Sequence, residues 1–337
     1  MENVYLPEGQ LISSPRNREL TASIEGLERA MSTGAILEGT ALLCDAEFNL
    51  HIDFPALPHV RGIMPREETA LSPDGEPIKD IAILTRVGKS VCFKVLRIEE
   101  GTRAGETVAV LSRRAAQVEC ATHYLSTLIP GDVIRARITH LESFGACADV
   151  GCGMPSLLSV DAISVSRISH PRDRVYNGQM IWAVVRHVDN SHSYSSSSSA
   201  GRYSGRIFLS TRELLGTWEQ NAARFTPGET VAGIVRSVED YGVFVELAPN
   251  LAGLADLRDG VHDRAALAAM VGRRAAVFIK SIIPERMKIK LVLIDAYKDD
   301  PIPAPKLTYF IDGESTAHID RWIYSPPAAR KRIETVF

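Results

Sequence analysis

Aromatic side chains next to a glycine are the residues of this sequence with the clearest chemical use. Phe144 precedes Gly145 and Tyr241 precedes Gly242, each between runs of alternating apolar residues. An exposed ring at such a corner can stack on any nucleic-acid base, and each stacked base contributes about 1–3 kcal/mol. The alternative is that these rings fill the core of a domain. The residues by themselves leave both interpretations open.

Catalytic patterns do not accompany these aromatics. The nine histidines are scattered, and none pairs with a serine, cysteine or carboxylate at a recognisable catalytic spacing. No phosphate-binding loop, carboxylate cluster or nucleophile motif is visible. The five cysteines form no Cys-x-x-Cys pair, which indicates reduced thiols rather than disulfides or metal ligands. The sequence therefore predicts a binding protein that is not an enzyme and needs no metal or cofactor.

An internal repeat positions the two aromatic corners. The segments that begin at Pro130-Gly131 and Pro227-Gly228 align at a fixed offset of 97 (241 minus 144). Each continues through an alternating strand, the aromatic–glycine corner and a second strand. A glycine there permits the tight bend that small barrels need between strands.

The second half of the repeat occurs three times. Val87-Gly88-Lys89, Asn177-Gly178-Gln179 and Val271-Gly272-Arg273 each open an apolar strand, and a polar turn and a closing strand follow. Units of five short strands at this spacing predict small barrels. The predicted fold is mainly β, with three tandem five-stranded oligonucleotide-binding barrels joined by short helical linkers.

The repeat also sets the expected domain boundaries. Residues before Gly34 form an N-terminal helical segment, in which Leu20, Ile24, Leu27 and Met31 have helical spacing. In the C-terminal extension, two alternating runs around Asp312-Gly313 predict a hairpin. The expected domains are an N-terminal segment at 1–33, a degenerate barrel at 34–113, a second barrel at 127–211 with a serine-rich loop at 190–204, a third barrel at 227–297 and the C-terminal extension at 298–337.

Composition limits how the chain could bind nucleic acid. The net charge is −3 and the sequence pI is about 6.3, so any RNA binding must be local, through stacking and a few placed cations. No apolar run approaches the roughly 20 residues that cross a bilayer. The N-terminus has no basic segment followed by an apolar one. We therefore expect a cytoplasmic protein with no membrane contact.

With these repeats, the chain resembles the S-one RNA-binding domain, a five-stranded oligonucleotide-binding fold, over roughly residues 36 to 297. Two further details are similar to bacterial ribosomal protein S-one and its short Firmicutes relatives. They are Gly62-Ile63-Met64-Pro65-Arg66-Glu67-Glu68 in the first unit, and Leu209-Ser210 running into Glu213-Leu214-Leu215-Gly216-Thr217-Trp218 after the second. The similarity is strong in the third unit, good in the second and weak in the first.

The resemblance implies an RNA face with two aromatics flanking the glycine corner, a histidine, an aspartate and a basic residue. This sequence departs from that pattern: Cys147 replaces the second aromatic of the second unit, and Pro65, Ser159 and Asp256 replace the histidine. The RNA-binding residues that the resemblance implies are Phe144, Arg137, Asp189, Arg206, Tyr241, Phe244 and Lys288. The alternative, purely structural roles are core packing for Phe244, a turn cap for Asp189 and ordinary solvated charge for Arg206 and Lys288.

The serine-rich tract lies between the fourth and fifth strands of the second barrel, a loop that such folds use to clasp ligand. Tyr194, Arg202 and Tyr203 within it are candidate RNA contacts. Such a tract is more often a spacer than a site.

Two functions follow as hypotheses. The first is binding of single-stranded RNA in translation, with mRNA held near the small ribosomal subunit by a monomeric protein. The second is a protein-interaction scaffold, in which the first barrel docks a ribosomal protein or another partner. An enzyme that carries these barrels as an appendage is the least favoured interpretation, because little chain lies outside the barrels.

Overall fold

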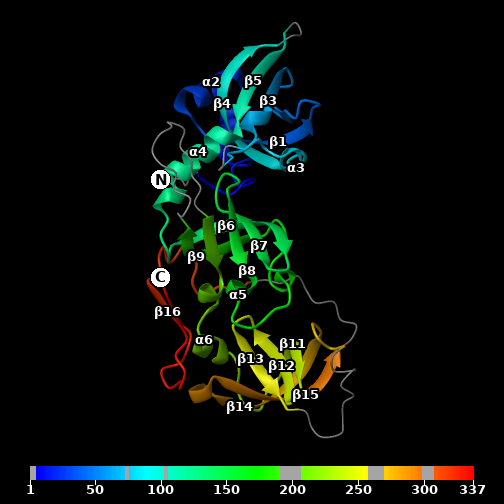
Figure 1. The fold of residues 1–337 in the computed structure, drawn as a ribbon, viewed down its shortest axis with the longest axis vertical. Coiled ribbons are helices and arrows are strands. Elements are labelled where there is room, and N and C mark those ends of the chain that lie inside the picture. The colour runs from blue at the N-terminus through cyan, green and yellow to red at the C-terminus, as the bar shows by residue number, and fades with distance from the viewer. Residues whose placement is uncertain (1–4, 73–75, 102–104, 190–205, 257–268, 298–306) are drawn as a thin grey trace. The chain divides into compact units, whose positions relative to one another are not determined.

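Three closed five-stranded β-barrels follow one another along the chain (Figure 1). The structure, a computed structural model, describes residues 5–72, 76–101, 105–189, 206–256, 269–297 and 307–337. Short helical segments connect the barrels, and helices precede the first one. The predicted fold class is therefore confirmed.

The first barrel has the strand order β1-β2-β3-β5-β4, in which β3 and β5 are parallel. Its core contains Phe54 and Phe93, whose rings meet edge-to-face with centroids 6.0 Å apart. Its elements are β1 (Leu37–Cys44), β2 (Leu50–Ile52), β3 (Val60–Met64), η1 (Arg66–Glu68), α3 (Asp80–Leu84), β4 (Ser90–Glu100) and β5 (Thr107–Ser112).

The second barrel repeats this topology in the order β10-β8-β7-β6-β9. A helical linker of α4 (Arg113–His123) and η2 (Leu125–Thr127) leads into it, and Ser112 caps α4 by accepting a hydrogen bond from the Ala115 amide. Its elements are β6 (Val133–Glu142), β7 (Gly145–Asp149), β8 (Pro155–Ser159), α5 (Val160–Ile163), η3 (Pro171–Asp173), β9 (Met180–Asp189) and β10 (Arg206–Ser210).

The third barrel has the order β11-β12-β13-β15-β14. The linker before it contains η4 (Arg212–Leu215) and α6 (Trp218–Ala222), and a capping box between Thr217 and Gln220 starts α6. Its elements are β11 (Thr230–Glu239), β12 (Gly242–Ala248), β13 (Leu251–Ala255), β14 (Arg274–Ile283), η5 (Pro284–Arg286) and β15 (Lys288–Tyr297).

The glycine of each aromatic corner lets two strands approach closely. A Cβ placed on Gly145 would lie 2.6 Å from the carbonyl oxygen of Leu158, and one on Gly242 would lie 2.7 Å from that of Ala255. Real side chains do not tolerate such contacts, so the corner requires glycine. The backbone next to each aromatic is thus fixed by packing, which leaves the ring to project from the barrel.

The described residues group into two compact units. Unit 1 contains the N-terminal segment, the first barrel, α4 and residues Asp149–Ser156. Unit 2 contains most of the second barrel, the third barrel and the C-terminal segment. Among the described helices, none has the length and apolar character needed to cross a membrane.

The N-terminal segment forms two short helices, α1 (Pro15–Leu20) and α2 (Ile24–Thr33), instead of one amphipathic helix. The helix is interrupted at Ser23, because the Ser23 side chain accepts a hydrogen bond from the Gly26 amide and so caps the start of α2. Leu20 and Leu27 are buried as predicted, whereas Ile24 and Met31 are 36% and 37% exposed. The N-terminal segment is thus helical, as expected, but the helical spacing of these four residues runs across two separate helices.

A buried ion pair fixes the extended segment that precedes α1. The Glu8 carboxylate accepts hydrogen bonds from Arg113 Nε at 2.6 Å and Nη2 at 3.0 Å, and from the Cys92 amide at 3.1 Å. Burial would raise the pKa of the Glu8 carboxyl, but Arg113 and Arg86 hold that pKa below its ordinary value. Burial and the nearby Glu8 carboxylate raise the pKa of Asp149 to about 7. Glu8 is thus ionised, and it is the main counter-charge of Arg113.

A second buried cluster lies in unit 2. Glu246 of β12 accepts hydrogen bonds from Arg174 and, at 2.6 Å, from Arg236 Nε. Asn250 donates to the carbonyl oxygens of Arg212 at 2.7 Å and Gly216 at 2.8 Å, which ties the turn after β12 to the linker. The second and third barrels therefore share polar contacts inside unit 2.

The C-terminal segment packs within unit 2 and ends in a two-stranded sheet of β16 (Arg321–Ile323) and β17 (Glu334–Val336). A hairpin is thus present, but its strands lie beyond the predicted runs around Asp312-Gly313. Asp312 forms a turn instead, because its carboxylate accepts hydrogen bonds from the Glu314 and Ser315 amides.

Candidate nucleic-acid interface

The two aromatics of the third barrel lie on its outer surface. Tyr241, in the turn between β11 and β12, is 65% exposed. Phe244 is half-buried and points outward, since its neighbours Val243 and Val245 are buried in the barrel core. The Tyr241 and Phe244 rings meet edge-to-face, with centroids 6.2 Å apart and an interplanar angle of 88°. We call this pair the aromatic ledge; it offers ring surface to a ligand, and core packing does not explain it.

A row of outward-facing residues continues from this ledge across the sheet. Phe244 pairs with Leu254 of β13, and Leu254 pairs with Lys290 of β15. The predicted cation, Lys288, is exposed but pairs with Ile283 next to the β14–β15 turn. Lys290 is therefore the basic residue in register with the ledge. The sequence prediction missed it because this register depends on the parallel pairing of β13 and β15.

The second barrel presents a different set of rings. Phe144 is 58% exposed in the turn after β6, as the stacking interpretation expects. Phe208 of β10 pairs with Leu157, which lies 97 residues before Leu254, so Phe208 occupies the place that Lys290 has in the third barrel. The Phe208 ring is 6.0 Å from the exposed ring of His187.

Phe208 and His187 are candidate contacts that sequence reasoning missed. One signal was available: Phe208 follows Arg206 by two residues, so both side chains leave the same face of β10. Arg206 is exposed at the first residue of β10. Phe208 thus offers a ring on the strand where the second barrel lacks the lysine of the third.

Arg137 and Asp189 are not brought together by the structure. Arg137 of β6 pairs with Met180, the first residue of β9, whereas Asp189 is the last. Nine residue steps along a strand span about 30 Å. The antiparallel register of β6 and β9 therefore sets Arg137 and Asp189 at opposite ends of β9. Asp189 lies two residues after His187, on the side of the barrel that carries Phe208.

Tyr194, Arg202 and Tyr203 lie outside the described residues. The same holds for the serine-rich loop at 190–204 that contains them.

The first barrel has no aromatic ledge at the equivalent place. His51 pairs with Ile63, and Ile63 with Val110, so His51 occupies the position of Phe244. The His51 Nε2 atom lies 3.0 Å from the Asp45 carboxylate. Phe48, at the corner, packs on the barrel core, and its ring is covered by the Arg66 guanidinium at 4.8 Å from the ring centroid. The aromatic ring at this corner is thus not available to a base.

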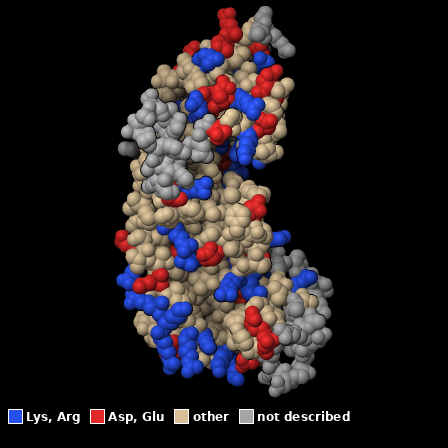
Figure 2. All heavy atoms as spheres, viewed as in Figure 1, with Lys and Arg blue, Asp and Glu red and all other residues tan. Residues whose placement is uncertain are grey.

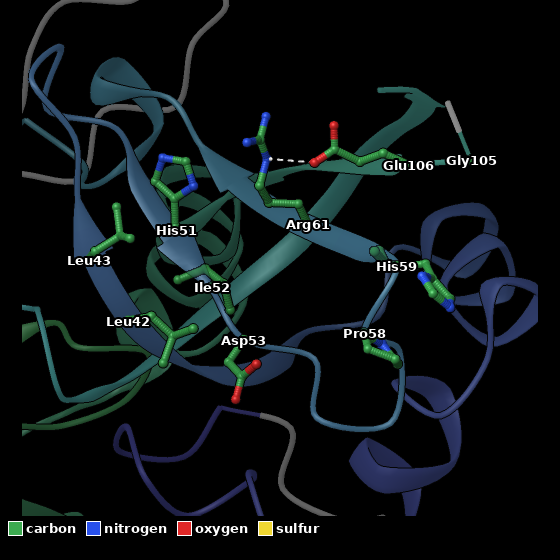
Figure 3. A pocket seen from close by; sticks show the side chains of 11 residues that line it. Leu42, Leu43, His51, Ile52, Asp53, Pro58, His59, Arg61, Gly105 and Glu106 are labelled. Atoms are coloured by element: carbon green, nitrogen blue, oxygen red, sulfur yellow. Dashed lines mark ion pairs between the residues drawn. The ribbon is translucent and has the colours of Figure 1, made fainter. Parts of the chain in front are cut away.

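A hollow of about 410 Å³ lies beside His51 on the first barrel (Figure 3). Leu42 and Leu43 of β1 line it and are 56% and 47% exposed. An ion pair between Arg61 and Glu106, 3.6 Å apart, stands at its edge. Exposed leucines beside a paired charge suit an apolar side chain of a partner better than a stacked base.

Sequence comparison finds similar proteins among the bacterial small ribosomal subunit proteins bS1. The bS1 of Staphylococcus saprophyticus is 30% identical over 172 residues, which are 50% of this chain and 40% of that protein. The bS1 homolog of Bacillus subtilis is 29% identical over 175 residues, 50% of this chain and 41% of its own. The bS1 of Staphylococcus aureus is 27% identical over 223 residues, which are 64% of this chain and 52% of that protein. The predicted resemblance to bS1 is confirmed, and the chain spans about half the length of the curated relatives it matches.

Structural comparison gives partial matches. A multidomain protein with nucleic acid binding domains from Streptococcus pneumoniae matches 77% of this chain and 73% of its own at 13% identity, with a TM-score of 0.23. GSP13 from Bacillus subtilis matches 31% of this chain and 63% of its own at 17% identity, with a TM-score of 0.20. No family model matches the sequence. The barrel assignment therefore rests on the strand order itself.

Proposed function

We propose that the chain binds single-stranded RNA on the outer faces of its second and third barrels and acts in translation, where it holds mRNA near the small ribosomal subunit. The observation that carries this proposal is the exposure of Phe144 and Tyr241 at equivalent corners of two barrels. Phe208 and Phe244, both half-buried, add ring surface on the outer faces of these barrels. Stacking of an exposed ring on a base stabilises the complex, whatever the base sequence. The similarity to proteins named bS1 supports the connection to the ribosome.

Two barrels on one chain strengthen weak binding. Each face offers few rings and cations, so each barrel by itself binds RNA modestly. The linker from Ser210 to Thr230 is short and contains η4 and α6, so a strand held by one barrel stays at high effective concentration near the other. We infer a monomer that binds RNA in the cytoplasm with micromolar affinity and with tolerance for pyrimidine or A/U sequences.

A fluorescence titration tests this function. A labelled single-stranded RNA of about 12 nucleotides should bind the full chain at low salt, and the affinity should fall as salt rises, because phosphate contacts release counterions. A duplex RNA of the same sequence should bind more weakly, since paired bases do not offer free stacking faces. No anisotropy change at low salt would contradict the proposal.

The first barrel favours a second, separate role. Its ring at the corner is covered, and its outer face carries exposed Leu42 and Leu43 at the hollow. This surface fits the docking of a protein, for instance a component of the small ribosomal subunit. Partner binding through this hollow would survive substitution of the aromatics in the other two barrels.

A further inference from the structure

A basic run near the C-terminus, Arg330-Lys331-Arg332, is held against the third barrel. The amide of Arg330 donates to the carbonyl oxygen of Glu285 in η5, at 2.9 Å. Ile333 packs on the core cluster of the third barrel, and its carbonyl oxygen accepts a hydrogen bond from the Tyr324 amide at 2.9 Å. Trp322 and Tyr324 are buried in the same cluster. The run at 330–332 is therefore a fixed part of the surface at the β14–β15 turn.

Cations from three elements meet at this turn. Arg286 of η5, Lys288 and Lys290 of β15, and Arg330 and Lys331 are all exposed. Figure 2 shows Lys and Arg side chains gathered on the end of unit 2 that carries β14 and the C-terminal hairpin, with few carboxylates among them. The net charge of −3 therefore conceals a local concentration of positive charge.

Several of these cations are available to a ligand. Arg332 pairs with Glu334 at 3.1 Å, and Arg321 pairs with the same carboxylate at 2.6 Å. Within the part of the chain that the structure describes, Arg286, Arg330 and Lys331 have no carboxylate partner. Exposed cations of one sign attract a polyanion, and short spacing between them suits the repeated phosphates of a nucleic acid.

The cations are continuous with the aromatic ledge. From Phe244, two steps between neighbouring strands lead through Leu254 to Lys290, roughly 10 Å away. Two residues along β15 then lead to Lys288, about 7 Å further, next to η5. Arg330 contacts η5 through its amide. Rings at one end and cations along the rest match the two chemical parts of a single-stranded nucleic acid.

We propose that the C-terminal segment extends the RNA site of the third barrel: the phosphodiester backbone leaves the aromatic ledge, passes Lys290 and Lys288, and is bound by Arg286, Arg330 and Lys331. We call this surface the basic track. The inference rests on the proposed RNA binding and adds a phosphate-binding role for the C-terminal segment. RNA fits better than a membrane surface, because the track begins at rings placed for stacking.

The test replaces three cations of the track together, as Arg286→Gln, Arg330→Gln and Lys331→Gln. Removing three phosphate contacts should reduce the slope of log affinity against log salt by about 2. The affinity for single-stranded RNA should then fall about 100-fold at 0.1 M salt, and the difference should vanish toward 1 M. The loss should be large for an oligonucleotide of about 12 residues and small for one of about 4, which the ledge by itself can hold.

The matched control removes the same charge elsewhere, as Arg16→Gln, Lys79→Gln and Lys89→Gln, three exposed positions of unit 1. The control should keep the salt slope of the parent protein. Tryptophan emission, which includes buried Trp322, confirms that the C-terminal segment remains packed in the variant.

Each outcome is decisive. If the parent protein binds RNA and the triple variant keeps its slope and length dependence, the basic track is overturned and the proposed function stands. If the parent protein binds no RNA at low salt, both fail. If the triple variant loses the parent protein's binding to vesicles rich in phosphatidylserine but binds RNA as the parent does, the cations belong to a membrane site and the basic track is also overturned.

Discussion

Alanine at Phe144, Tyr241 and Phe244 together should weaken the binding of single-stranded RNA by at least about 100-fold. Each stacked base contributes about 1–3 kcal/mol, and a loss of 1.4 kcal/mol is a factor of ten in affinity. The Tyr241 and Phe244 rings touch, so their single losses are not expected to add. Fluorescence anisotropy with an oligonucleotide of about 12 residues measures the effect.

The salt dependence distinguishes stacking from charge. The triple alanine variant should keep the salt slope of the parent protein, because no cation is removed. Adding Phe208→Ala should reduce the affinity further, since this ring lies on the outer face of β10. Tyr176→Ala is the matched control, because Tyr176 is 50% exposed but precedes β9, at the opposite end of that strand from His187. Equal affinities for the triple variant and this control would contradict a stacking role.

Glu8→Gln should lower the free energy of unfolding of unit 1 by about 3–5 kcal/mol, the usual effect of removing one partner of a buried ion pair. Arg113 is 2% exposed and would lose the carboxylate that meets two of its guanidinium nitrogens. Urea unfolding can follow unit 1 by the reactivity of its buried thiols Cys92, Cys120 and Cys152.

Tryptophan emission supplies the comparison within the same molecule. Trp182, Trp218 and Trp322 are the three tryptophans of the chain, and all lie in unit 2. The urea midpoint of the transition in tryptophan emission should shift much less than the midpoint measured by thiol reactivity. Glu19→Gln is the control variant: it removes an exposed pair with Arg29, which is expected to contribute less than about 1 kcal/mol. A Glu8→Gln protein as stable as the Glu19→Gln protein would show that the buried pair does not hold the N-terminal segment.

The repeat made the barrels predictable, because strand alternation and glycine corners are local signals that recur at a fixed offset. The corners placed Phe144 and Tyr241 between strands, but they left open whether the rings face the core or solvent, and the structure shows both rings exposed. The register across the sheet could not be predicted in this way. Lys290 reaches the row of Phe244 through a parallel pairing between strands that are far apart in sequence, and Arg137 is separated from Asp189 by the register of β6 and β9.

Segments outside the repeat were less predictable for related reasons. The apolar spacing from Leu20 to Met31 continues through Ser23, but the serine caps a new helix there. No local pattern marks Glu8, since its burial depends on Arg113, more than a hundred residues away in sequence. The place of Arg330 likewise depends on contacts with the third barrel that are distant in sequence, such as its hydrogen bond to Glu285.

Crosslinking shows directly whether RNA lies on the outer faces of the second and third barrels. The full chain is bound to single-stranded RNA that contains 4-thiouridine, irradiated and digested, and the attached peptides are mapped by mass spectrometry. Attachment is expected at Phe144 and Phe208 in the second barrel and at Tyr241 and Phe244 in the third. Attachment confined to the first barrel, around His51 and the hollow beside it, would contradict this placement of the RNA.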